Sequence, residues 1–212
     1  MTIQINKGDI INNEELTELF KCSTQGGMRR SHKTNTLVLV SNPKSIYSDR
    51  WFGKELHYTG MGSTGDQILG TQNKTLHESN SNGVEVHLFE VFELREYTYQ
   101  GIVVYNGKAY QENQTDIDGN KRKVWMFPIE LKDSSPIRVK DTVIKKLQKE
   151  KQKSLRKLNK QQIKRLAESK KETTQSYRLT ETKSIERDEY IKLYALERAK
   201  GNCQLCENPA PF

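Results

Sequence analysis

The composition of the chain changes at Pro136, and this change limits the folds that the chain can adopt. Upstream of Pro136, short apolar segments alternate with turn sequences. Downstream, residues 137–171 contain neither glycine nor proline and carry 14 Lys and Arg against 3 Asp and Glu, a net charge of +11. Glycine and proline are the residues that disfavour helix interiors most strongly. The sequence therefore predicts a first domain followed by a long, exposed basic helix.

The first part has the pattern of an α+β domain built mainly from strands. In the segment VEVHLFEVF, Val84, Val86 and Leu88 alternate with polar residues, which is the period of a half-buried strand. Turn sequences such as Ser-Asn-Gly and Asp-Gly-Asn separate several strand candidates. The candidates are residues 36–42, 55–60, 84–92, 97–107 and 123–131.

Helical segments are expected on both sides of this strand-rich region. Residues 13–21 predict a short amphipathic helix, whereas residues 23–35 predict a basic, glycine-rich loop. Residues 185–201 predict a further helix that ends at Gly201. The expected organisation is a domain over 1–135, a basic helical linker over 136–184, and a helix with the start of another domain over 185–212.

The charge distribution points to a polyanionic partner. The whole chain of 212 residues has a net charge of +8, but residues 1–136 carry −2 and residues 172–212 carry −1. Concentrated positive charge is typical of nucleic-acid binding, although a solvated helix explains the charge alone equally well. No run approaches the roughly 18 apolar residues of a membrane span, and the N-terminus lacks a secretory signal. A cytoplasmic protein with no membrane partner is expected.

Seven short motifs of the first part occur in a characteristic order. They are GGMRRS (26–31), LVLV (37–40), YSD (47–49), HYTGMG (57–62), QNKTL (72–76), YTYQG (97–101) and VWMFPIEL (124–131). Together they resemble the SRA domain, also called the SET- and RING-associated or YDG domain, of the McrA-like type. The resemblance covers about residues 24–132 and implies an SRA/PUA-like twisted β-barrel with peripheral helices.

The resemblance also implies a function and a set of pocket residues. SRA domains bind double-stranded DNA that contains modified cytosine, and they flip the base into a pocket. By this resemblance Tyr58 stacks on 5-methylcytosine or 5-hydroxymethylcytosine, Thr59 lines the pocket, and Asp49 accepts a hydrogen bond from the exocyclic amine. Carboxylate pairing with cytosine N4 is also the expected readout on general grounds. Tyr47 is a candidate second stacking ring, although the family position corresponds to Ile46.

Contacts to the DNA backbone are expected around this pocket. Gly60 and Gly62 would let the main chain approach the flipped nucleotide. The candidate phosphate-binding cations are Arg29, Arg30, Lys33 and Lys74. Such contacts add salt dependence to binding and carry no sequence information.

The segment GNCQLCENPAPF resembles the first zinc-knuckle half of a McrA-type HNH nuclease. The resemblance implies that Cys203 and Cys206 supply half of a zinc site, and that a complete HNH domain binds zinc and a divalent catalytic metal. Two thiolates do not close a tetrahedral zinc site. The given chain is therefore expected to need no cofactor and to cleave nothing itself, and its SRA-like domain is expected to act as the recognition module of a modification-dependent HNH restriction endonuclease.

Two other functions fit the same sequence. A PUA- or ASCH-like RNA-binding module would use the basic helix without needing Asp49, and an interaction protein would pair its lysine-rich helix with a partner helix. A homodimer is compatible with each of these functions. Binding to duplexes with and without the modified base, at two salt concentrations, separates them.

Overall fold

The computed structural model describes residues 3–116, 118, 120–133, 135–169, 176–178, 180, 184–185, 189–203 and 208–209. This part contains eleven strands and five helices. The strands are β1 (Ile10–Ile11), β2 (Met28–Ser31), β3 (Thr36–Ser41), β4 (Arg50–Gly53), β5 (Glu55–Thr59), β6 (Glu85–Glu90), β7 (Tyr97–Tyr105), β8 (Tyr110–Thr115), β9 (Lys121–Leu131), β10 (Tyr177–Arg178) and β11 (Ser184–Ile185). The helices are α1 (Asn13–Phe20), α2 (Thr71–His77), α3 (Asp141–Leu155), α4 (Lys160–Ser169) and α5 (Glu189–Ala199).

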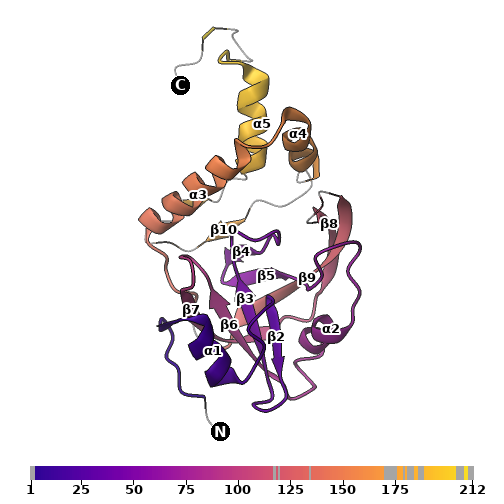
Figure 1. Cartoon of the computed structure of the whole chain (residues 1–212), viewed down its shortest axis with the longest axis vertical. Coiled ribbons are helices and arrows are strands. Elements are labelled where there is room, and N and C mark those ends of the chain that lie inside the picture. The colour runs from indigo at the N-terminus through magenta and orange to yellow at the C-terminus, as the bar shows by residue number, and fades with distance from the viewer. Residues whose placement is uncertain are drawn as a thin grey trace.

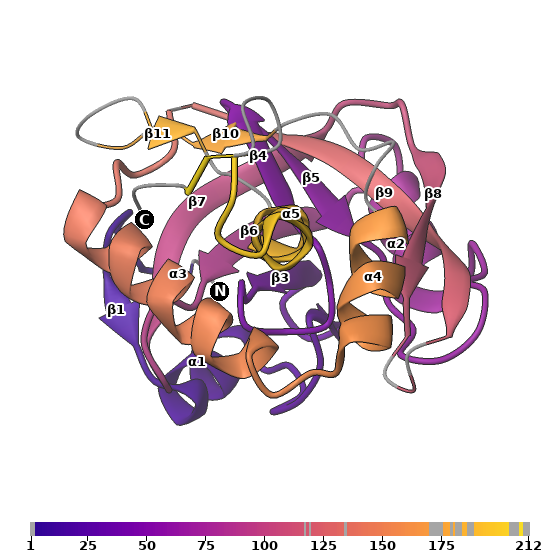
Figure 2. The same ribbon diagram turned by 90° about the horizontal axis from the view of Figure 1, so that it is seen from above.

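All the strands belong to one curved sheet. The order is β11-β10-β4-β5-β9-β7-β6-β3-β2, with β1 pairing with β7 and β8 pairing with β9. Figures 1 and 2 show that the sheet curls around its interior, with α1 and α2 at its sides and α3, α4 and α5 gathered at one end. The α+β class is confirmed. In the described residues the two ends of this order, β2 and β11, do not pair with each other, so the curved sheet is open and the barrel is not closed.

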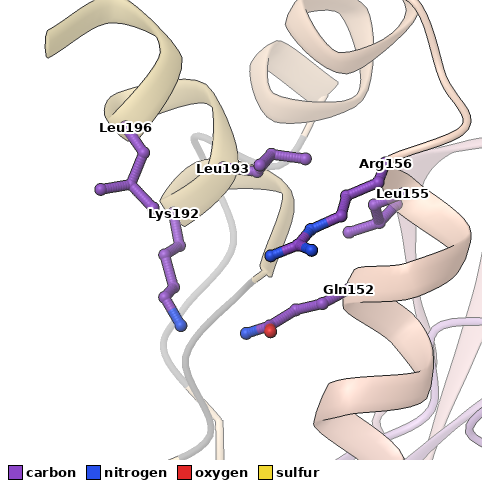
Figure 3. Close-up of a pocket in the computed structure, with 6 residues that line it drawn as sticks. All are labelled: Gln152, Leu155, Arg156, Lys192, Leu193 and Leu196. Atoms are coloured by element: carbon purple, nitrogen blue, oxygen red, sulfur yellow. The ribbon is translucent and has the colours of Figure 1, made fainter. Parts of the chain in front are cut away.

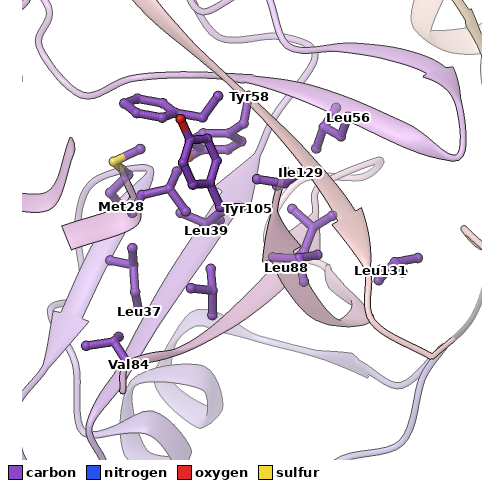
Figure 4. Packing of buried hydrophobic residues seen from close by; sticks show 14 of the residues in the cluster. Met28, Leu37, Leu39, Leu56, Tyr58, Val84, Leu88, Tyr105, Ile129 and Leu131 are labelled. Atoms are coloured by element: carbon purple, nitrogen blue, oxygen red, sulfur yellow. The ribbon is translucent and has the colours of Figure 1, made fainter. Parts of the chain in front are cut away.

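The core forms because the strands bury alternating or continuous apolar residues. Leu37, Leu39, Leu56, Leu88 and Ile129 are fully buried and belong to the main cluster inside the curved sheet. Figure 4 shows how these side chains converge from different strands. Burying one such side chain contributes about 1.5–3 kcal/mol, so the cluster stabilises the strand pairing.

A second cluster lies under α1. The helix begins after Asn12, whose side chain accepts the main-chain N–H groups of Glu14 and Glu15. The Glu15 carboxylate in turn accepts the N–H of Asn12, which completes a capping box. Leu16 and Phe20 are fully buried and pack with the other members of the cluster. The predicted helix at 13–21 is confirmed.

The five predicted strands are confirmed, but several elements were missed. The predicted loop over 23–35 contains β2, which pairs with β3 through the register Met28↔Leu39. Strand β4, strand β8 and helix α2 also lacked a clear sequence signal. Strand β8 has the sequence YQENQT, whose polar residues do not alternate with apolar ones, and α2 has only seven residues.

The basic segment forms two helices, so the prediction of one long helix was wrong. Helix α3 ends at Leu155, and α4 begins at Lys160. The side chain of Asn159 accepts the N–H of Gln162, and the side chain of Gln162 accepts the N–H of Asn159, both at 2.9 Å. This reciprocal pair is a capping box, which starts a new helix. The spacing Asn-x-x-Gln was the available signal in the sequence.

The C-terminal part is attached to the sheet through β10. This strand pairs in parallel with β4, through the register Tyr177↔Phe52. Helix α5 confirms the predicted last helix, and it ends where Lys200 and Gly201 both adopt positive φ. None of the described helices is long and apolar enough to cross a membrane.

Candidate nucleic-acid interface

Asp49 lies where three strands of the sheet meet. It follows an irregular loop after β3 and immediately precedes β4. Its Oδ2 accepts the hydroxyl of Ser41, the last residue of β3, at 2.8 Å. Its Oδ1 accepts the main-chain N–H of Thr59, the last residue of β5, also at 2.8 Å. The two bonds fix the carboxylate beside the YTG motif, as the sequence predicted for an amine acceptor.

The environment of Asp49 favours its neutral form. Burial raises the pKa of the Asp49 carboxyl to about 6. The hydrogen bonds from Thr59 and Ser41 oppose this shift, and the nearby Glu90 carboxylate adds to it. A carboxyl whose pKa is displaced toward neutrality by burial is typical of functional sites.

Tyr58 lies against Asp49 but is part of the core. Its side chain is 3% exposed, and its hydroxyl donates to the carbonyl of Gly27 at 2.7 Å and lies 3.3 Å from that of Val40. Burial, and then the negative charge of Asp49, raise the pKa of Tyr58 well above its ordinary value. Figure 4 shows the ring at one end of the main cluster, near Met28. The aromatic ring is thus held in one orientation.

The four predicted pocket residues are neighbours, and Tyr58 and Thr59 are buried, whereas Asp49 and Tyr47 are partly exposed. Thr59 is 2% exposed. Tyr47 is half-buried, whereas Ile46 is exposed at 37%. Because Tyr58 is 3% exposed, a base can stack on its ring only if side chains that cover the ring move.

The local structure explains why glycine occupies positions 60 and 62 of the motif. A Cβ on Gly60 would lie 2.8 Å from Oε1 of Gln67 and 2.9 Å from Oδ1 of Asn73. Gly62 has a φ of +131°, a conformation that favours glycine. Both positions let the turn fold against Gln67, whose Nε2 donates to the carbonyl of Gly60 at 2.6 Å. The approach of a DNA backbone here stays a prediction.

The predicted phosphate-binding cations do not form one group. Arg29 is 4% exposed, and its guanidinium donates to Gly26 and Asn13, which favours a structural role over the predicted phosphate contact. Arg30 likewise donates to the carbonyls of Ser31 and Thr36 and to the side chain of Asn35, within the β2–β3 turn.

The two predicted lysines lie on different sides of the pocket. Lys33 is exposed in the turn that precedes β3, whereas Ser41 and Asp49 lie at the other end of that strand. A strand rises by about 3.3 Å per residue, so the length of β3 separates Lys33 from the pocket. Lys74 is exposed on α2, whose Asn73 accepts the N–H of Met61 at 2.7 Å. Of the four cations, Lys74 is therefore the one that is both exposed and near the motif.

One of the two predicted zinc ligands lies outside the described residues. Cys203 is described and donates its N–H to the carbonyl of Asn208 at 2.8 Å, but Cys206 is outside the described part. No group of three or more candidate metal ligands occurs among the described residues. The zinc ligands therefore stay a prediction.

A cavity of about 130 Å³ lies between α3 and α5, away from the motif residues (Figure 3). It is lined by Gln152, Leu155, Arg156, Lys192, Leu193 and Leu196. Its walls come entirely from the C-terminal helices. It therefore belongs to the junction of these helices and contains none of the predicted site residues.

Sequence reasoning missed a buried polar group beside the pocket. Arg122 is 2% exposed on β9, and Gln114 is 5% exposed opposite it on β8. Within the described part of the chain, Nε and Nη2 of Arg122 and Oε1 of Gln114 have no hydrogen-bond partner. The signal was available, because the side chain of Arg122 shares the inward face of β9 with Val124 and Met126, an unusual place for a charge.

A family model decides which fold this is. The model of the ScoMcrA-like SRA domain matches residues 7–156. The chain belongs to this SRA family. The match extends past residue 135 into α3, and it includes the residues that hold Asp49 and Tyr58. Because the match is to the SRA family, nothing favours the alternative of a PUA- or ASCH-like RNA-binding module.

Three solved structures with a similar architecture are distant in sequence. The sulfur-binding and SRA domains of ScoMcrA complexed with phosphorothioated DNA match with a TM-score of 0.52 and 15% identity, over 68% of this chain and 45% of that one. The SUVH5 SRA domain with fully methylated CG DNA matches with a TM-score of 0.49 and 23% identity, over 64% and 95%. The same domain with fully hydroxymethylated CG DNA gives 0.48 and 23%, over 64% and 95%. No curated protein matches the chain.

Proposed function

We propose that this SRA domain recognises modified cytosine in double-stranded DNA by rotating the base out of the helix. The observation that carries the proposal is the grouping of Asp49, Tyr58, Thr59 and Tyr47 at the ends of β3 and β5. A pyrimidine held there would lie on the ring of Tyr58 and donate its exocyclic amine to Asp49. Membership of the SRA family supports this arrangement.

The capacity of Asp49 for another hydrogen bond supports its role. An ionised carboxylate has about four lone-pair sites, and Thr59 and Ser41 occupy two of them. The remaining sites can accept the amine of cytosine. Thymine carries a carbonyl at the same ring position. Its oxygen would face the carboxylate oxygen of Asp49, and two hydrogen-bond acceptors in contact are unfavourable. The carboxylate thus separates 5-methylcytosine from thymine, although both bases carry a 5-methyl group.

The basic helix α3 is placed to add affinity without specificity. Lys44, in the loop between β3 and Asp49, pairs with Glu150 of α3 at 2.6 Å. Lys146 of the same helix pairs with Glu93 at 2.6 Å. These contacts hold the helix beside the loop that carries Tyr47. Exposed lysines on α3 can therefore reach the phosphates of a duplex engaged at the pocket.

The deciding experiment measures affinity for matched duplexes with cytosine, 5-methylcytosine or 5-hydroxymethylcytosine at one position, at two salt concentrations. We expect the wild-type protein to prefer a modified duplex and Asp49→Ala to lose that preference. Asp133→Ala, at an exposed position, serves as the matched control and should behave as the wild type. Equal affinity of the wild-type protein for all three duplexes would refute the proposal.

We further propose that this module directs an HNH nuclease in a modification-dependent restriction protein. The support is the Cys-x-x-Cys sequence that follows α5. Zinc and a divalent catalytic metal would then belong to the nuclease domain. A protein that joins this module to a complete HNH domain should cleave modified DNA only when a divalent metal is added. Metal-independent or modification-independent cleavage would contradict this role.

A further inference from the structure

Arg122 is a buried cation without a hydrogen-bonded anion. Its Nη1 donates to the carbonyl of Gly62, whereas Nε and Nη2 have no hydrogen-bond partner among the residues that the structure describes. Asp116 attracts the guanidinium through space, but its carboxylate accepts the main-chain N–H groups of Asp118 and Asn120. Burying an ion without such a partner is costly in free energy. A buried unpaired group of this kind calls for an explanation.

The position of Arg122 connects it to the proposed pocket. Gly62 is the last residue of the motif that contains Tyr58. The ring of Tyr47 lies over the guanidinium, with its centroid 5.9 Å from Cζ. Thr59 is the Cα partner of Met126 on β9, and Met126 shares its face of the strand with Arg122. Thr59 and Arg122 therefore face the same side of the sheet.

Gln114 adds an acceptor next to these donors. It is the Cα partner of Arg122 across the β8–β9 ladder, so the two side chains lie on one face. Its Nε2 donates to Glu112 at 2.9 Å and lies 3.5 Å from Sδ of Met126, which leaves Oε1 unused. Among the described residues, these atoms form a polar wall of unused donors and an unused acceptor across the β8–β9 ladder. Such a wall fits a nucleotide, which offers both acceptors and donors.

We infer that Arg122 is a further recognition residue, which donates to an acceptor oxygen of the rotated-out nucleotide, either of its phosphate or of its base. Movement of Tyr47 on binding uncovers the guanidinium and the face of Tyr58 together. The inference rests on the proposed function, because an acceptor reaches Arg122 only when the nucleotide leaves the DNA helix. The hydrogen bond to Gly62 uses only Nη1 of Arg122, so it does not explain why the rest of the guanidinium is buried.

The test compares Arg122→Met with Lys121→Met, which removes an exposed charge from the neighbouring residue of the same strand. Affinities are measured for the 5-methylcytosine duplex and for the unmodified duplex. We expect Arg122→Met to weaken binding of the modified duplex by about tenfold to a hundredfold, the usual effect of losing a hydrogen bond to a charged group. Binding of the unmodified duplex should change little, and Lys121→Met should weaken both duplexes alike.

A third duplex identifies the acceptor. It carries neutral methylphosphonates in place of the phosphates that flank 5-methylcytosine. If Arg122 binds a phosphate, Arg122→Met has no further effect on this duplex; if it binds the base, the full effect remains. Either result supports the inference.

Thermal unfolding of the free protein separates a structural role from recognition. Replacing an unpaired buried ion by an apolar side chain of similar size is expected to leave stability unchanged or raise it. A lower melting temperature with an unchanged preference for the modified duplex would overturn the inference and leave the proposed function intact. If the wild-type protein has no preference for modified DNA, the proposed function fails and this inference fails with it.

Discussion

The carboxylate of Asp49 accepts the main-chain N–H of Thr59 at 2.8 Å, so the predicted amine acceptor is attached to the strand that carries the predicted stacking ring. Ser41 holds the second oxygen from another strand of the sheet. An acceptor fixed in this way needs little reorganisation when a base arrives, which is the general requirement for a selective site. The position of Asp49 relative to Tyr58 and Thr59 is therefore set by the sheet, whereas Tyr47 is carried by the loop before Asp49.

The pKa of Asp49 predicts a pH dependence of recognition. The ionised carboxylate accepts the cytosine amine, and its pKa in the free protein is about 6. At pH 5 only about a tenth of the carboxyl is ionised, so we expect the preference for the modified duplex to fall up to about tenfold between pH 7.5 and pH 5. Fluorescence-anisotropy titrations at several pH values measure this ratio. Asp49→Asn should show a lower preference that does not vary over the same range.

The raised pKa of Asp49 also predicts how the stability of the protein depends on pH. This dependence has the opposite sign to the one that a salt-bridged carboxylate, with its lowered pKa, produces. The folded-state pKa lies above the ordinary value of 3.8, so the folded protein disfavours the ionised form. Protonation between about pH 6 and pH 4 removes this penalty. The free energy of unfolding of the wild type, relative to Asp49→Asn, should therefore rise as the pH falls through this window. Urea unfolding at pH 7 and pH 5 checks the sign, and a falling difference would contradict the raised pKa.

Tyr58 is expected to serve stability through its hydroxyl and recognition through its ring. Tyr58→Phe removes the hydrogen bond to Gly27 and leaves a buried carbonyl less well satisfied, which should cost about 1–2 kcal/mol in the free energy of unfolding. The preference for modified DNA should persist, because the ring remains. Tyr58→Leu keeps an apolar side chain without the ring and should lose the preference. Retention of the preference by Tyr58→Leu would exclude stacking on this residue.

The sequence predicted the fold where the pattern of apolar residues was strong. Strands β3, β6 and β7 have long apolar runs or clear alternation, and helix α1 has a capping residue and two buried apolar positions. Strand β8 and helix α2 escaped prediction because tertiary contacts stabilise them more than their own composition does. Strand β8 pairs along its whole length with β9, a contact that no local pattern reveals.

The candidate site also contains residues that the sequence indicated and residues whose role depends on tertiary contacts. Asp49 and Tyr58 could be singled out because their spacing matches a known family, and the structure brings them together. Arg29 was misjudged because a basic residue in a glycine-rich segment predicts exposure, whereas Asn13 of α1 provides a buried partner for its guanidinium. Arg122 was missed because β9 carries several charged residues, and only the inward-facing position that Arg122 shares with Val124 and Met126 distinguishes it from its exposed neighbours Lys121 and Lys123.

The lysines of α3 should increase affinity for all duplexes equally. Lys145, Lys149 and Lys153 are exposed and recur every fourth residue, so they lie on one face of the helix. Changing all three to Gln should weaken binding of modified and unmodified DNA by the same factor. The slope of log affinity against log salt should fall by about 0.9 for each phosphate that the variant no longer neutralises. Deleting 137–171 is unsuitable as a test, because Ile144, Leu155 and Ile163 are buried.

A control for this prediction lies at the far end of β3. Lys33→Gln removes an exposed charge remote from Asp49 and should leave both affinity and the salt slope unchanged. A loss of preference in the α3 variant, with affinity for unmodified DNA unchanged, would show that the helix reads the base and would contradict this division of roles.

The ion pair between Arg178 and Glu90 should fasten the C-terminal segment to the SRA domain. Both residues are buried, at 6% and 2% exposure, and Trp51 also donates to Glu90, at 3.0 Å. The Arg178 guanidinium lies over the rings of Trp51 and Phe92, at 5.5 and 5.0 Å from their centroids. Removing one partner of a buried pair leaves an unpaired charge, so Arg178→Met should lower the free energy of unfolding by about 3–5 kcal/mol.

The double variant Glu90→Gln/Arg178→Met provides the control, because it removes both charges. We expect it to be more stable than the sum of the two single effects predicts, since no unpaired ion remains in the core. Denaturant unfolding of the four proteins gives the coupling energy directly. If the effects of the single changes simply add, the two side chains do not act as a pair, and the attachment of β10 must depend on its main-chain bonds to β4.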